Sequence, residues 1–285
     1  MKKIFLIINL ILIFFLGQSA KGALPENHEP RYISLAPSTT EILFSLGLDK
    51  EIIGVSSFCN YPLKAQEKEK IGSFSQPNIE KILSLKPDII FCTGLEQTPA
   101  VGKLRQLDLK VYVSNPSNME ELFTSIKEMA ALTDKEKEAE VLVYTMKLKI
   151  EKIYSKVKLI PQQNRPTVFV EYWNKPLMTA GRDSFIDDLI TLAGGVNIAY
   201  DTPRPYSYFS PEVVIRRNPT CIILAYMVNE KAAQAIRERL GWRNISAIKH
   251  NRVYTDINPD LLLRPGPRVV EGLAEMYKRL YLKNE

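Results

Sequence analysis

The sequence predicts an α/β fold in which two similar lobes are joined by one long helix. Three observations support this prediction. Strands and helices alternate along the chain, an uninterrupted helical pattern stands near the middle, and part of the first half resembles part of the second. The predicted division is a signal peptide over 1–23, an N-terminal lobe over 24–132, a connecting helix over 133–160 and a C-terminal lobe over 161–285.

The first half reads as short apolar strands separated by helices, which is typical of a mostly parallel sheet with both faces covered. Pro37 and Pro87 each separate a helix from a strand, and Ser38 with Glu41 has the spacing of a capping box at a helix start. The predicted strands are 31–36, 51–56, 88–92 and 110–114, and the predicted helices are 38–46, 79–85, 103–107 and 119–132.

The long helix is predicted over 133–158. Thr133 and Glu136 have capping-box spacing at its start, and neither Gly nor Pro interrupts it. Its apolar residues recur every three or four positions on one face: Ala139, Leu142, Met146, Ile150, Ile153 and Val157. Such a helix spans roughly 35–40 Å, about the width of a small domain. It could be a surface helix of one domain or a rigid connection between two lobes.

The second half repeats the pattern of the first. Strands are predicted at 167–172, 221–225 and 252–255, and helices at 184–193, 211–217 and 267–281. Residues 78–91 match 210–224 when Pro87 is laid on Pro219, and 110–117 resembles 252–259 in the same order. Two ordered matches favour an internal duplication, so the long helix becomes the connector. A cleft between lobes is then the expected ligand site.

The N-terminus has the order of a secretory signal peptide. Lys2 and Lys3 precede an apolar run over 4–16, and small residues follow it up to Ala23. The run is short for a membrane span, although an uncleaved anchor is the alternative. The first cysteine is Cys59, which argues against a lipid-modified N-terminus. We therefore expect an exported protein that is released into solution.

Charge and cysteine spacing exclude several classes. Part of the net charge of +6 comes from the N-terminal lysines, and no basic stripe suggests nucleic-acid binding. Cys59, Cys92 and Cys221 show no C-x-x-C spacing, which disfavours a structural zinc site. Cys59 and Cys92 could form a disulfide, and the sequence leaves this open.

Catalytic patterns are scarce. The sequence has no G-x-G-x-x-G, P-loop, G-x-S-x-G or H-E-x-x-H motif, and its two histidines, His28 and His250, fall in polar loops. We therefore expect no enzymatic activity, no cofactor and no metal held by protein side chains. An exported α/β enzyme is the rival class, and it would need a nucleophile and base that the sequence does not reveal.

Glu80 and Glu212 occupy equivalent places in the two halves. Each falls in the first turn of a predicted helix, after Asn78 or Ser210 as the expected N-cap residue. Each carboxylate could simply favour the positive end of its helix dipole. Alternatively, two equivalent lobes present one exposed carboxylate each to cationic groups of a partner.

Aromatic residues concentrate in predicted loops, where they could line a site for a large, flat, partly apolar ligand. They are Phe58, Tyr61, Phe74, Tyr172, Trp173, Tyr206, Tyr208 and Phe209. Asp260 and Arg264 stand in the predicted loop before the last helix. They could pair with each other or donate and accept hydrogen bonds with a polar ligand.

The stretches SLAPSTTEILFSLGL, GVSSFCNYP and GSFSQPNIEKILSLKPDII, with the long helix, resemble the substrate-binding proteins of cobalamin and iron-siderophore ABC importers. The resemblance covers about 31–280. It implies a class III periplasmic binding protein with two Rossmann-like lobes, a rigid helical backbone and little lobe closure. It also implies a monomer that captures a metal chelate in the periplasm and delivers it to a permease with its ATPase.

Residue by residue, the resemblance implies that Glu80 and Glu212 dock onto arginine clusters of the permease. It assigns ligand contacts to Phe58, Phe74, Tyr206, Asp260 and Arg264. A family tryptophan corresponds to Thr93 here, and two of the aromatic matches are substitutions. Cobalamin or a related corrinoid is the expected ligand, carried without a cofactor. An iron siderophore or haem is the alternative.

Overall fold

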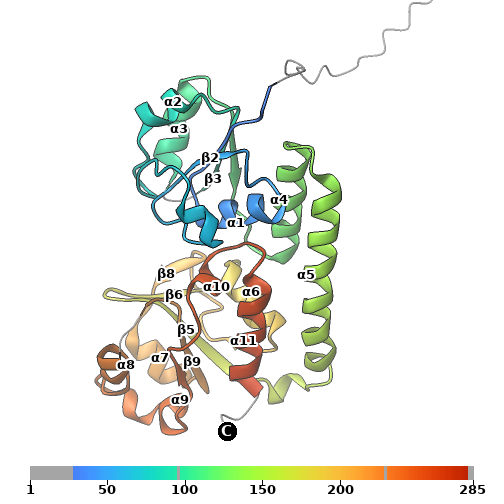
Figure 1. The fold of residues 1–285 in the computed structure, drawn as a ribbon. Coiled ribbons are helices and arrows are strands. Elements are labelled where there is room, and N and C mark those ends of the chain that lie inside the picture. Colours follow the sequence, from blue (N-terminus) through green and yellow to red (C-terminus); the bar gives the residue numbers. More distant parts are fainter. Residues whose placement is uncertain (1–27, 95–96, 228–229, 282–285) are drawn as a thin grey trace, which may run out of the picture. The chain divides into compact units, whose positions relative to one another are not determined.

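The computed structural model describes residues 28–94, 97–227 and 230–281, and the signal peptide predicted over 1–23 lies outside them. Residues 31–285 form one compact unit, to which the following description is confined. Within it are two separate sheets, each flanked by helices (Figure 1). The predicted α/β class with two lobes is confirmed. The lobe boundaries given above remain a prediction.

The N-terminal lobe is built on a four-stranded parallel sheet of order β2-β1-β3-β4. Three of its strands are almost continuously buried, as expected where helices cover both faces, and the edge strand β4 is mainly half-buried. The strands are β1 (Tyr32–Ser34), β2 (Ile52–Val55), β3 (Ile89–Thr93) and β4 (Val111–Ser114). The helices are α1 (Pro37–Ser45), α2 (Ile79–Leu85), α3 (Thr98–Gln106) and α4 (Met119–Ala131).

The C-terminal lobe combines parallel and antiparallel pairings. Its sheet has the order β10-β9-β5-β6-β8, with β7 also paired to β5. The strands are β5 (Thr167–Asn174), β6 (Leu177–Ala180), β7 (Val196–Asn197), β8 (Tyr206–Tyr208), β9 (Cys221–Leu224) and β10 (Val253–Tyr254). The helices are α6 (Phe185–Leu192), α7 (Pro211–Arg217), α8 (Glu230–Arg237), α9 (Ser246–Lys249), α10 (Asp260–Leu263) and α11 (Val269–Tyr281).

Strand order supports the internal duplication. In the N-terminal lobe the parallel order is β2-β1-β3-β4, and in the C-terminal lobe β7-β5-β9-β10 repeats it. The second lobe departs from the first where β5 continues beyond its parallel pairing with β7 and pairs antiparallel with β6. Strands β6 and β8 are additions that the alternation of strands and helices did not predict.

The long helix α5 (Glu136–Val157) packs on α4 of the first lobe and on α6 and α11 of the second (Figure 1). The predicted apolar face is confirmed, since all six residues are buried or half-buried. The predicted capping box is wrong. The N-cap residue is Lys135, and the Thr133 hydroxyl instead donates to the Met129 carbonyl, 2.9 Å away in the preceding helix.

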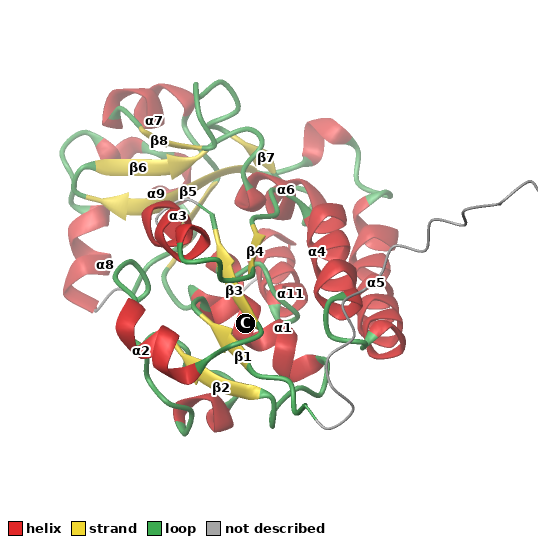
Figure 2. Ribbon diagram, turned by 90° about the horizontal axis from the view of Figure 1, so that it is seen from above, coloured by secondary structure: helices red, strands yellow, loops and turns green. Residues whose placement is uncertain are grey.

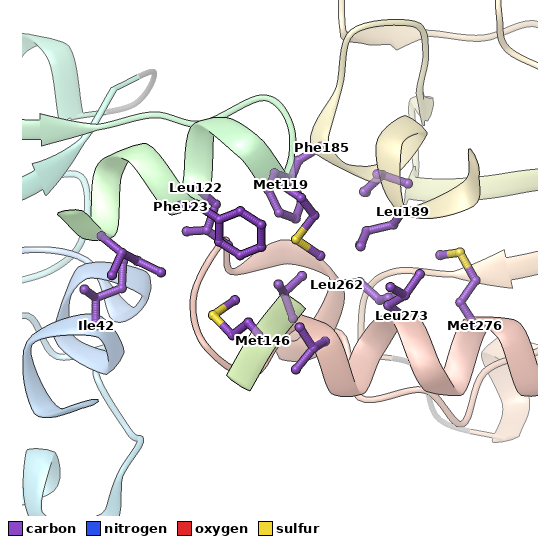
Figure 3. Close-up of a cluster of buried hydrophobic side chains, with 14 of the residues drawn as sticks. Ile42, Met119, Leu122, Phe123, Met146, Phe185, Leu189, Leu262, Leu273 and Met276 are labelled. Carbon is purple, nitrogen blue, oxygen red and sulfur yellow. The ribbon is translucent and has the colours of Figure 1, made fainter. Parts of the chain in front are cut away.

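One hydrophobic core runs through both lobes. It joins Ile42 and Phe123 of the first lobe to Leu189 and Leu273 of the second, with Met146 of α5 in the same cluster (Figure 3). A core with so many fully buried side chains is close-packed and resists relative movement of its parts. The two lobes are therefore fastened together along the side that carries α4, α5, α6 and α11.

Several smaller predictions about caps, cysteines and element bounds are wrong. Ser38 and Glu41 do not cap α1, which begins at Pro37 after Ala36. Cys59 and Cys92 are not paired, because all three cysteines are free and buried, these two in different core clusters. The predicted loop at 260–264 contains the short helix α10, and α3 begins earlier than the predicted 103–107.

Candidate functional site

Arg264 connects the two lobes. It follows α10 in the second lobe, and its Nη1 donates to Asn60 Oδ1 of the first lobe at 2.7 Å. Its Nη2 lies 2.9 Å from Asp260 Oδ1, so the predicted polar pair is in contact. Only 15% of the Arg264 side chain is exposed. The pairing within 260–264 is therefore present, and the contact with Asn60 adds a bridge between lobes that the sequence did not predict.

Glu41 is the centre of the same bridge. It is only 2% exposed, and it accepts hydrogen bonds from Arg268 Nε at 2.8 Å and Arg268 Nη2 at 2.6 Å. Arg264 Nη1 lies 3.5 Å from the same carboxylate. The Arg268 guanidinium also stacks on the Tyr61 ring, 3.8 Å from its centroid. Hydrogen bonding to Glu41 raises the pKa of Arg268.

Sequence reasoning missed the roles of Glu41 and Arg268 because it interpreted Glu41 as a capping residue. The available signal was a charged residue inside an apolar helix, together with the two arginines of R-P-G-P-R. A buried carboxylate requires a cationic partner, and this motif supplies two. Glu41, Arg264 and Arg268, with Asn60 and Tyr61, are called the interlobe bridge below.

Phe58 stands beside the interlobe bridge. It lies in the loop after β2, two residues before Asn60, and 56% of it is exposed. Asn60 in turn accepts from Arg264, which contacts Asp260. Three predicted ligand residues, Phe58, Asp260 and Arg264, therefore come from different lobes to one part of the boundary between them.

Phe74 is held near the carboxyl end of the first sheet. Its carbonyl accepts from Gln97 Nε2 at 2.8 Å, and the same amide group donates to the Leu35 carbonyl at 2.8 Å. Gln97 is fully buried and also accepts from the Thr93 amide. Gly72 has φ +103°, and a Cβ there would lie 2.7 Å from the Gln76 carbonyl, so the loop needs glycine.

Tyr206 belongs to β8 rather than to the predicted loop. Its ring packs on Tyr172 with centroids 4.9 Å apart, and burial raises the pKa of its hydroxyl. Tyr172 belongs to β5, and Phe209 stacks on the core residue Phe169. Part of the predicted aromatic group is therefore ordinary packing. Tyr206 is half-buried and contacts neither Phe58 nor Phe74 through any ring pairing among the described residues.

Glu80 and Glu212 lie in the first turns of α2 and α7, as predicted. The Asn78 side chain accepts from the Lys81 amide, and the Ser210 side chain accepts from the Glu212 amide, so both N-caps are confirmed. Both glutamates are exposed. A hydrogen bond from the Ser210 hydroxyl lowers the pKa of Glu212. In two perpendicular views, α2 and α7 lie on the side opposite α5 (Figures 1 and 2).

Two cavities open elsewhere on the surface. One of about 670 Å³ lies in the C-terminal lobe between the β5–β6 turn and the start of α7, and Tyr208, Phe209 and Arg239 line it. The other, of about 490 Å³, lies between α4, α5 and α6 beside Asp188. None of the five predicted ligand residues lines either cavity.

A second buried ion pair lies in the C-terminal lobe. Glu171 is fully buried and accepts from both terminal nitrogens of Arg239, at 2.9 and 3.1 Å, and from the Tyr226 hydroxyl at 2.6 Å. Burial raises the pKa of Tyr226, and its hydrogen bond to Glu171 adds to this. This satisfied network fastens α8 and its following turn to the end of the sheet.

The described residues contain no group of three or more His, Cys, Asp or Glu side chains placed to hold a metal ion. In the same part of the chain, no helix combines the length and the apolar character needed to cross a bilayer.

A comparison with protein families matches residues 33–258 to the family described as periplasmic binding protein. The chain belongs to this family. Its members are substrate-binding transport proteins rather than enzymes. The chain is accordingly a substrate-binding protein of an ABC transporter, and such a protein works with a permease and an ATPase.

Individual relatives agree with this assignment. An uncharacterized ABC transporter substrate-binding lipoprotein of Bacillus subtilis is 33% identical, over 89% of this chain and 81% of the relative. The structure of the periplasmic vitamin B12-binding protein of Vibrio cholerae is 29% identical with a TM-score of 0.74, covering 88% of this chain and 96% of that one. A possible iron-binding protein of Staphylococcus epidermidis is 31% identical with a TM-score of 0.78, covering 88% and 98%. The fold is thus the class III periplasmic binding protein fold.

Proposed function

We propose that this protein captures cobalamin or a related corrinoid between its lobes and delivers it to the membrane permease of an ABC importer. The observation that carries the ligand site is the position of Arg264. It reaches from the second lobe to Asn60 of the first, two residues along the chain from the exposed Phe58. The similarity to a vitamin B12-binding protein over most of both chains supports the choice of ligand.

The chemistry at this boundary suits a corrinoid. A corrin ring has an extended apolar face and carries amide side chains around its rim. Phe58 and Phe74 can contact the ring through area burial, and Tyr206 adds an aromatic face from the second lobe. Asp260 accepts and Arg264 donates, so the pair can hydrogen-bond amide groups. The cobalt arrives inside the ligand, and no protein-held cofactor is needed.

An iron siderophore or haem is the alternative ligand, and the similarity to a possible iron-binding protein supports keeping it. Haem iron would require a tyrosine or histidine ligand at the site. The ring of Tyr206 packs on Tyr172, and Tyr208 lines the cavity of the C-terminal lobe rather than the interlobe bridge. A catecholate siderophore is anionic and would require an excess of positive charge, whereas the charge of Arg264 is balanced by Asp260 and Glu41. A neutral amide of a corrinoid requires only a hydrogen-bond donor, which a paired guanidinium can still supply, so the corrinoid is favoured.

Glu80 and Glu212 are proposed to dock onto arginines of the permease. Their equivalent, exposed positions in duplicated lobes support this role. Charge pairs at an exposed surface mainly orient partners and accelerate their encounter. We further propose that the protein acts as a monomer in the periplasm, after removal of a signal peptide within 1–23.

Calorimetric titration of refolded, signal-free protein tests the ligand. Refolding removes ligand carried over from cells. Cyanocobalamin, a ferric siderophore and haemin are titrated in parallel. One-to-one binding of cyanocobalamin at submicromolar affinity, without heat from the other two, is the expected result. Binding of an iron chelate alone would transfer the function to the alternative.

A double variant tests docking. Glu80→Ala with Glu212→Ala is expected to leave ligand affinity unchanged, because neither residue lies at the interlobe bridge. Association with the permease–ATPase complex in lipid nanodiscs should weaken. Normal transport by the double variant would contradict the docking assignment.

A further inference from the structure

The segments around Glu80 and Glu212 match in burial as well as in sequence. With Pro87 laid on Pro219, residues 78–86 and 210–218 have the same class of exposure at every position. Both helices then end in the left-handed conformation, at Lys86 with φ 46° and Asn218 with φ 45°. The two lobes therefore present the same pattern of exposed and buried positions around the two glutamates.

Each of the two matching segments carries an exposed aliphatic side chain that neither caps the helix nor fills the core. Leu83 on α2 is 40% exposed, and Ile215 at the equivalent position of α7 is 37% exposed. The buried position next to each, Ile82 or Val214, supplies the contact with the core. Leu83 and Ile215 each follow a proposed docking glutamate by three residues, and residues three apart lie on one face of a helix. Each lobe thus presents a carboxylate and a branched aliphatic side chain on the same face of one helix.

Other exposed positions of the two segments do not share their chemistry. Ser84 corresponds to Arg216, and Lys86 corresponds to Asn218. Asn78 and Ser210 are alike, but both cap their helices. Apart from the helix-capping residues, the exposed side chains that the two segments share are therefore the glutamate and the aliphatic residue.

We propose that Leu83 and Ile215 are the apolar half of the two permease contacts, next to Glu80 and Glu212. The proposal rests on the docking role given above and extends it. The matching partner surface presents a cationic side chain beside an apolar depression, and it does so twice, in equivalent copies. Burial of the aliphatic groups supplies affinity, whereas the glutamates supply orientation and encounter rate.

The geometry disfavours a second copy of this chain as the occupant. A two-fold symmetric dimer through these surfaces would set α2 of one copy against α7 or α2 of the other. Glutamate would then face glutamate, and like charges repel. On the second lobe, Ile215 also lies against Gly241, where an added Cβ would be 2.8 Å from its Cδ1.

The test first identifies the permease–ATPase complex, encoded in the same genome, that binds the wild-type protein when the complex is embedded in nanodiscs. The binding of four variants to that complex is then compared. They are Leu83→Ser with Ile215→Ser, Glu80→Ala with Glu212→Ala, Leu83→Ile with Ile215→Leu, and the control Val141→Ser with Leu148→Ser. The control residues are also exposed, at 67% and 47%, and lie on α5. Association and dissociation rates are measured at two salt concentrations.

The serine pair is expected to bind about tenfold more weakly, mainly through faster dissociation, with the salt dependence of association unchanged. The alanine pair should instead lose association rate and salt dependence. The aliphatic exchange and the α5 control should bind like wild type. Weakening by the alanine pair alone would overturn this proposal and leave glutamate docking standing. Weakening by neither pair, or failure of every complex to capture the wild-type protein, would overturn both.

Discussion

Removing the Glu41 carboxylate should destabilise the whole 31–285 unit. Glu41 is 2% exposed and accepts two hydrogen bonds from Arg268, whose side chain is 15% exposed. Truncation of one partner of a buried ion pair costs about 3–5 kcal/mol, because the other charge is left uncompensated. Water can still reach part of Arg268, so the lower end applies. We expect Glu41→Ala to cost about 3 kcal/mol.

This cost translates into a large thermal shift. For a domain near this size, 1 kcal/mol lowers the Tm by about 2–4 °C, so Glu41→Ala should lower it by about 6–12 °C. Glu41→Gln keeps the shape and one acceptor, and its Tm should fall between those of wild type and Glu41→Ala. The assay is thermal unfolding of ligand-free protein followed by far-UV circular dichroism at 0.15 M salt.

Asp256→Ala is the matched control. Asp256 also pairs with an arginine at 2.6 Å, but its side chain is 58% exposed and its partner Arg279 belongs to the same lobe. Exposed pairs contribute about 0–1 kcal/mol and weaken with salt. The control should therefore shift the Tm by less than about 4 °C. If Glu41→Ala shifted it no further than the control, burial would be a poor guide to the strength of the interlobe bridge.

Three further predictions concern titration, the ligand and the thiols. Burial raises the pKa of Asp188 in the folded protein, although the hydrogen bond from the Met119 amide opposes this shift. The contribution of Asp188 to folding stability is therefore complete below its unfolded pKa of 3.8, and it is lost as the pH rises through the higher folded pKa. Asp188→Asn, which can still accept that bond, should therefore gain stability relative to wild type across this window in pH-dependent urea unfolding. Phe58→Ala should weaken cyanocobalamin binding about tenfold with the Tm unchanged, because the ring is 56% exposed; unchanged affinity in calorimetry would place the ligand elsewhere. Burial raises the pKa of Cys92 and of Cys221 to about 12, so neither should react with Ellman's reagent at pH 8 until the protein unfolds.

Local sequence signals predicted elements well where one segment determined them. The prolines and N-cap residues gave α2 and α7 with their observed bounds, because Asn78 and Ser210 do cap these helices. The same kind of signal failed at Glu41 and Thr133. Glu41 forms an ion pair with Arg268, and the Thr133 hydroxyl donates a hydrogen bond to the preceding helix. The spacing of residues alone cannot distinguish these interactions from a helix cap.

The sequence could indicate candidate residues for the site, but it could not indicate which of them contact one another. Pairing of Asp260 with Arg264 was one of two alternatives, and the two side chains are in contact. The hydrogen bond from Arg264 to Asn60 spans more than half the chain, so no local pattern could indicate it. Gln97, which fixes the Phe74 loop, stands in a polar stretch that gives no sign of a buried amide. Strands β6 and β8 were missed because they are short and antiparallel within an otherwise parallel pattern.

The core cluster that both lobes share has a consequence for protein engineering. Because Ile42, Phe123, Leu189 and Leu273 belong to one cluster, a cut near residue 132 would leave apolar faces bare on both fragments. We therefore expect neither half to fold independently. Chimeras that exchange whole lobes between relatives should aggregate, whereas grafts confined to the loop at 73–77, which contributes no residue to this cluster, leave it intact. New ligand specificity is best sought through such loop grafts.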